Sequence, residues 1–119
     1  MKKTLIIGVS ENEQRYANRV MKILVEKGHE VIAIGKNPGK VSGVKIIAEK
    51  IEIEDLHTVT LYINAEIQKE YYDYIIAQEP KRVIFNPGSS NEEFEKSLKN
   101  EGIQVLNSCS LIMLTADQY

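Results

Sequence analysis

The 119-residue chain lacks several features that would point to whole classes of protein. It has a single cysteine, Cys109, so no disulfide can form within the chain, which suits a reducing compartment. No apolar run approaches the roughly 20 residues that span a bilayer, and the run after Met1-Lys2-Lys3 is too short for a secretory signal. We therefore expect a cytoplasmic protein that does not enter a membrane.

The charge balance also lacks any strong bias. The formal net charge is −2, from 15 basic and 17 acidic residues, so no broad field attracts nucleic acid or an anionic membrane. The two histidines, His29 and His57, have no partner at a metal-ligand spacing, and we expect no metal site. A local anion site stays open, because a helix N-terminus can form one without a basic surface.

Short β-branched runs instead alternate with amphipathic segments along the chain. Gly35 to Lys40 has the composition of a loop, and the pattern leaves residues 48–56 and the tail after Cys109 without an assignment. Helices are expected between Tyr16 and Gly28, over 65–77, and from an Asn91 cap to about Asn100. Strands are expected over residues 4–9, 29–34, 44–47 (a short edge strand), 58–63, 82–85 and 103–106.

This alternation predicts one α/β domain over residues 1–119. The first run is apolar almost throughout, which is typical of a strand buried on both faces at the centre of a parallel sheet. We therefore expect a Rossmann-like, doubly wound, mainly parallel sheet of five to six strands flanked by helices, in the order 3-2-1-4-5 with room for a sixth strand. Ligands of such sheets bind beyond the carboxyl ends of the strands, where the winding reverses.

The segment Gly8 to Arg15 joins the first strand to the first helix at that point. Gly8 allows a tight turn and a close approach of a ligand to the backbone. The N-terminus of the following helix favours binding of a phosphate. Ser10 could donate a hydrogen bond from its hydroxyl, and the planar guanidinium of Arg15 could donate two to phosphate oxygens. The alternative is a plain turn with Ser10 as a helix cap and Arg15 as a surface charge.

The dinucleotide fingerprint is incomplete here. A G-x-G-x-x-G motif starting at Gly8 would need glycine at Ser10 and Glu13. The second strand ends in Gly35-Lys36 and not in the carboxylate that usually holds the ribose of NAD. A lysine there favours a ribose phosphate, as in coenzyme A or NADP, unless Lys36 is only a solvated loop charge.

Two further places in the sequence are candidates for chemistry. The loop after Phe85 holds Gly88 and Ser89 where backbone N–H groups could face the same crevice, unless it is an ordinary loop before the Asn91 cap. Cys109 could be a nucleophile only with a nearby base, and none is visible in the sequence. We therefore assign no catalytic residue.

The chain resembles the single-domain CoA-binding proteins, which are similar to the N-terminal domain of the succinyl-CoA synthetase α subunit. The resemblance covers nearly the whole chain and rests on the order and spacing of several short segments. They are Gly8-Val9-Ser10 with Arg15, Gly28-His29-Glu30-Val31, Gly35-Lys36, Val41-Ser42-Gly43-Val44-Lys45-Ile46, Asn86-Pro87-Gly88, and Gly102-Ile103-Gln104-Val105 leading to Cys109.

The resemblance implies CoA bound at the carboxyl edge of the sheet. By it, Gly8, Val9 and Ser10 would line the phosphates and Lys36 would lie near the nucleotide phosphates. Tyr62, Ile63 and Asn64 would flank the adenine, and Pro87, Gly88 and Ser89 would form the second loop. The family's Pro-Val-Asn-Pro after the second strand is replaced by Ala33-Ile34-Gly35-Lys36, and its proline-rich segment after the fourth by Ile63-Asn64-Ala65.

The first hypothesis is accordingly a non-catalytic module that binds CoA or an acyl-CoA. The second is an enzyme, either NADP-linked or acting on acyl-CoA through Cys109. The third is an interaction subunit without a ligand. A homodimer is an expected assembly because an open sheet exposes its edges.

Overall fold

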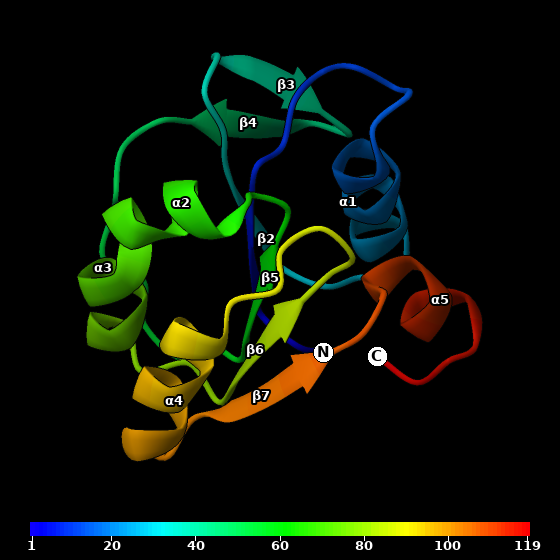
Figure 1. The fold of residues 1–119 in the computed structure, drawn as a ribbon. Helices are drawn as coiled ribbons and strands as arrows, with labels where there is room; N and C mark the ends of the chain where they lie inside the picture. The colour runs from blue at the N-terminus through cyan, green and yellow to red at the C-terminus, as the bar shows by residue number, and fades with distance from the viewer.

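The sheet of the computed structural model, which describes residues 1–119, has seven strands in the order β3-β4-β2-β1-β5-β6-β7 (Figure 1). All pairs are parallel except β3 with β4. The mainly parallel, doubly wound fold and the order of the six predicted strands are confirmed. The strands are β1 Thr4–Ile7, β2 Val31–Ile34, β3 Gly39–Val41, β4 Val44–Ile47, β5 Thr58–Leu61, β6 Arg82–Phe85 and β7 Gln104–Asn107.

The seventh strand, β3, lies partly in the segment predicted as a loop. It forms a hairpin with β4 through Ser42 and Gly43, whose φ angles are 49° and 81°. Two adjacent residues at positive φ are typical of the tight turn that joins antiparallel strands. β3 therefore takes the edge of the sheet, and the prediction that 44–47 is the edge strand is wrong.

The helices differ from the predictions at two places. The expected helix over 65–77 is divided into α2 Ala65–Gln68, the 3₁₀ turn η1 Lys69–Tyr71 and α3 Tyr72–Ala77. The tail forms a further helix, α5 Ser110–Thr115. The other two predicted helices are present as α1 Tyr16–Glu26 and α4 Glu92–Asn100, and Asn91 caps α4 by accepting a hydrogen bond from the Phe94 amide at 3.1 Å.

Helices cover both faces of the sheet (Figure 1). α1 and α5 lie on one face, and α2, α3 and α4 lie on the other. Every residue of β1 is buried; Leu5 and Ile7 join the core under α3 and α4, whereas Ile6 joins the core under α1. None of the helices is both long and apolar enough to cross a membrane.

The register of the central strands places the loops after β1, β5 and β6 side by side at the carboxyl edge of the sheet. Ile7, Leu61 and Phe85 are aligned across β1, β5 and β6, so the chain leaves each strand at the same edge. Gly8 follows Ile7 at φ 104°, and a Cβ built on it would lie 2.5 Å from the Tyr62 carbonyl oxygen. Glycine is therefore required for the loops after β1 and β5 to pack together.

Candidate functional site

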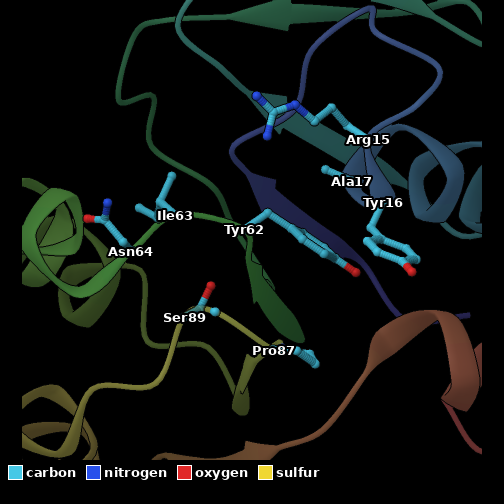
Figure 2. Close-up of a pocket in the computed structure, with 9 residues that line it drawn as sticks. Arg15, Tyr16, Ala17, Tyr62, Ile63, Asn64, Pro87 and Ser89 are labelled. Atoms are coloured by element: carbon cyan, nitrogen blue, oxygen red, sulfur yellow. The ribbon is translucent and has the colours of Figure 1, made fainter.

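A cleft of about 210 Å³ opens at the carboxyl edge of the sheet (Figure 2). We call it the α1 cleft, and it lies between two rims. The α1 rim is formed by Arg15, Tyr16 and Ala17. The loop rim is formed by Tyr62, Ile63 and Asn64 after β5, and by Pro87, Gly88 and Ser89 after β6.

The α1 rim has unused hydrogen-bond donors. Arg15 is the N-cap residue of α1 and makes no side-chain cap, and the first turn carries no acidic residue. The backbone amides of Tyr16, Ala17 and Asn18 have no acceptor in the protein. A helix start with free amides carries partial positive charge and is suited to an anion.

Arg15 adds a full charge to this rim. Its side chain is exposed and takes part in no ion pair. Figure 2 shows it extended from the start of α1 over the side of the cleft on which Ile63 lies. A guanidinium in this position can bind two oxygens of one phosphate.

The turn at Gly8 does not offer the free amides that we expected of it. The amides of Gly8 and Val9 both donate to the Ile34 carbonyl oxygen, at 2.9 and 3.2 Å. Val9 is buried, and the space beside the Gly8 backbone is filled by Tyr62. The turn therefore joins β1 to β2 and β5, and the free amides lie further along the chain, at the start of α1.

Ser10 is held within the same loop and does not line the cleft. Its Oγ accepts a hydrogen bond from the Asn12 amide at 3.2 Å, and its carbonyl oxygen accepts one from Asn18 Nδ2 at 2.9 Å. Glu11 fastens the loop to the hairpin by accepting a bond from the Lys40 amide at 3.0 Å. Ser10 is thus not the cap of α1, a role that the sequence left open for it.

Gly35 and Lys36 do not line the cleft. Gly35 is buried, and a Cβ there would collide with the Val9 carbonyl oxygen, so this glycine serves the packing of the loops after β1 and β2. Lys36 is exposed and forms no hydrogen bond or ion pair. Its charge is therefore unpaired within the fold.

Buried side-chain hydrogen bonds support the loop rim. Asn86 is 1% exposed; its Nδ2 donates to Thr60 Oγ1 at 2.6 Å and to the Leu61 carbonyl oxygen at 2.9 Å. Its Oδ1 accepts a hydrogen bond at 2.8 Å from the backbone amide of Ser110, which is the first residue of α5. Asn86 therefore fixes β5, β6 and α5 relative to one another.

Gln68 ties the two loops of this rim together. Its Nε2 donates to the carbonyl oxygens of Ile63 and Ser89, each at 2.8 Å, and its Oε1 accepts from Asn91 Nδ2 at 2.9 Å. Ser89 Oγ in turn donates to the Leu61 carbonyl oxygen at 2.9 Å. The positioning roles of Gln68 and Asn86 could not be predicted, because an isolated polar residue gives no local sign of being buried.

Tyr16 and Ala17 were also missed as lining residues. The amphipathic pattern assigned Tyr16 to the helix, but it contained no signal that the first turn faces the cleft. Both residues directly follow Arg15 at the start of a helix that comes after a parallel strand. Ligands bind at such helix starts, so this place in the chain could have predicted that they line the cleft.

One hydroxyl at the cleft has no partner. Tyr62 Oη is buried and has no partner at hydrogen-bonding distance and angle, although the Ser110 side chain lies near enough to oppose the rise of the Tyr62 pKa. Burial raises the pKa of the Tyr62 phenol well above its ordinary value, and the neighbouring Cys109 raises it further. The phenol therefore stays protonated and can donate a hydrogen bond.

The histidines lie at the opposite edge of the sheet. His29 precedes β2 and His57 precedes β5, at the amino ends of these strands. Burial lowers the pKa of each imidazole. Neither residue lines the α1 cleft, so neither can exchange a proton with a ligand bound there.

The family of the chain follows from its sequence as a whole. A model of the CoA binding domain family matches residues 2–115. The chain belongs to this CoA-binding domain family. No curated protein matches it.

Solved structures agree with the fold of this CoA-binding domain. A structure described only as an uncharacterized protein is 47% identical over 100% of this chain and 98% of its own, with a TM-score of 0.96. A hypothetical protein from Pyrococcus horikoshii OT3 is 28% identical over 97% and 82% of the two chains, with a TM-score of 0.86. A Thermus thermophilus protein, 21% identical over 99% and 91%, with a TM-score of 0.85, supports the fold alone.

Proposed function

We propose that this domain binds CoA at the α1 cleft and acts as a binding module without catalysis of its own. The family supports CoA as the ligand. The observation that carries the location is the uncapped start of α1, next to the unpaired Arg15, inside a cleft at the carboxyl edge of the sheet. Parallel α/β sheets bind nucleotides at this edge.

The pyrophosphate of CoA would lie against the α1 rim. The free amides of Tyr16 and Ala17 and the guanidinium of Arg15 supply donors for its oxygens. This differs from our first expectation, since the amides of Gly8 and Val9 are already bonded to Ile34. Gly8 would contribute by keeping the two rims close together.

Lys36 would meet a second phosphate. It follows β2, the neighbour of β1 in the sheet, and its charge is unpaired. CoA carries a phosphate on its ribose, and NADP carries one too, so Lys36 alone does not separate these ligands. The adenine would then lie near Tyr62, Ile63 and Asn64, as the family resemblance implies.

The residues around the cleft support a binding role over a catalytic one. No His, Asp, Glu, Lys or Cys lines the α1 cleft. General acid–base catalysis would need such a group within hydrogen-bonding reach of the ligand. Tyr16 and Tyr62 also line the cleft, but no base lines it with them. Cys109 lies in an adjoining pocket, where no His, Asp, Glu or Lys lines the wall beside it.

Titration calorimetry of the full chain with CoA, NADP, NAD and ATP tests the proposal. We expect CoA to bind tightest, and Arg15→Ala to weaken its binding about tenfold, because a charge-assisted hydrogen bond is lost. Lys99→Ala is the matched control, since it removes one exposed charge from the last turn of α4 and lies outside the cleft.

Equal affinity for CoA in the wild type and Arg15→Ala would move the phosphates away from the α1 rim. If NADP binds more tightly than CoA, NADP and not CoA is the ligand of this domain. If none of the four compounds binds, the hypothesis of an interaction subunit without a ligand is favoured.

A further inference from the structure

A second cavity, the α5 cavity, adjoins the α1 cleft. It has a volume of about 350 Å³, and its walls are Tyr16, Tyr62, Pro87, Cys109, Leu111 and Ile112. Tyr16, Tyr62 and Pro87 also line the α1 cleft. Figure 2 shows the rings of Tyr16 and Tyr62 side by side, extending from the cleft towards α5. A ligand seated in the cleft can therefore continue directly into the cavity.

The α5 cavity differs sharply from the cleft in chemistry. No charged side chain lines it. Two of its walls, Tyr16 and Ile112, are 60% and 65% exposed, and they are among the few large hydrophobic side chains that the fold leaves in contact with water. Covering such side chains with hydrocarbon is favourable, because apolar surface is removed from water.

The polar groups of the cavity walls are few and neutral: the hydroxyls of Tyr16 and Tyr62 and the thiol of Cys109. The Tyr62 hydroxyl is buried from solvent, so it is not counted as a contact for a ligand. Apolar walls without charge match an aliphatic chain. They match the pantetheine arm less well, since its amides each need both a donor and an acceptor.

We propose that the α5 cavity holds the acyl chain of a short- to medium-chain acyl-CoA, so that the domain binds the acylated cofactor in preference to free CoA. This inference rests on the proposed function. The phosphates at the α1 rim would fix one end of the ligand, and the pantetheine arm would lead past Tyr16 to an acyl chain beside Leu111 and Ile112. The protein would thereby report the length of the acyl chain and not only the presence of CoA.

The test is calorimetric titration of the full chain with CoA, acetyl-CoA, butyryl-CoA and hexanoyl-CoA. Each added methylene that is fully buried raises affinity about fourfold. Because the cavity is open to solvent on one side, we expect hexanoyl-CoA to bind at least about tenfold more tightly than acetyl-CoA. This ratio between the two ligands is the readout.

Two variants locate the effect. Ile112→Ser removes an exposed apolar wall of the α5 cavity, and we expect it to reduce the hexanoyl-to-acetyl ratio about threefold. Ile67→Ser is the matched control, since Ile67 is an exposed isoleucine of α2 that lines neither cavity. It should leave the ratio as it is in the wild type.

The outcomes separate the two proposals. If CoA binds but all four ligands have equal affinity, the acyl assignment is overturned and the proposed function stands. If the ratio is high but is insensitive to Ile112→Ser, the chain lies elsewhere and the α5 cavity assignment is wrong. If neither CoA nor any acyl-CoA binds, both proposals are overturned.

Discussion

The two rims of the α1 cleft use their polar groups in opposite ways. The α1 rim leaves the backbone amides of Tyr16 and Ala17 and the Arg15 guanidinium without protein partners. The loop rim is held from beneath by two buried residues, Asn86 and Gln68, which bond to the backbone of neighbouring segments. One rim therefore keeps its hydrogen-bonding capacity for a ligand, whereas the other uses it to hold its own shape.

This contrast separates the expected effects of mutations. Changes on the α1 rim should lower affinity and leave the free energy of unfolding nearly unaltered, because Arg15 makes no contact that the fold depends on. Changes beneath the loop rim should lower the free energy of unfolding, because unsatisfied buried polar groups are costly. The following variants test this division, from the largest expected effect to the smallest.

Gly8→Ala adds a methyl group where the loop after β1 packs against the loop after β5. The added Cβ would lie 2.5 Å from the Tyr62 carbonyl oxygen at a backbone φ of 104°. We expect a loss of about 4 kcal/mol in the free energy of unfolding, measured by urea denaturation, from backbone strain together with the steric clash.

Gly102→Ala is the matched control for this variant. Gly102 also has a positive φ, 78°, but a Cβ there would meet nothing within 4 Å. Its cost should be about 1 kcal/mol, from strain alone. Equal losses in the two variants would show that the close approach of the rims contributes nothing.

Asn86→Ala removes the central residue of the buried network. It leaves the Ser110 amide without an acceptor and Thr60 without one of its partners. We expect a loss of about 3 kcal/mol in the free energy of unfolding. Asn107→Ala deletes an exposed hydrogen bond to Glu95 and should change stability by less than about 0.5 kcal/mol. A similar small change in Asn86→Ala would contradict the structural role of the loop rim.

Tyr62→Phe tests the exception, a polar group of the loop rim that has no partner. Deleting the buried hydroxyl removes an unsatisfied donor, so we expect thermal unfolding to show a gain of about 1 kcal/mol. Tyr16→Phe removes a hydroxyl from an exposed ring and should have no measurable effect. A loss of stability in Tyr62→Phe would mean that this hydroxyl is bonded within the fold.

Much of the architecture could be read from the sequence. The central place of β1 followed from its being apolar almost throughout, which is typical of a strand buried on both faces. The Asn91 cap followed from residue type and position, and the structure confirms it. The β3–β4 hairpin was not predicted, although Ser42-Gly43 between Val41 and Val44 is a turn signal, because its first strand begins at Gly39 within a segment of loop-like composition.

The site was only partly predictable, because its chemistry depends on which polar groups are already used. The sequence marks Gly8 as a turn next to a strand, and that turn exists. That the amides of Gly8 and Val9 are bonded to Ile34 depends on β2 lying beside β1 at a particular register. The same holds for the α5 cavity, which exists because the tail folds back next to α1.

The sequence by itself therefore determined the family, the strand order and the edge of the sheet at which a ligand would bind, since apolar runs and turn residues act within a few positions of the chain. Only the tertiary structure decided that the free donors lie at the start of α1 and that Asn86 is buried beneath the opposite rim. Whether a polar group is satisfied or available depends on neighbours that are distant in the chain, and no local pattern records them.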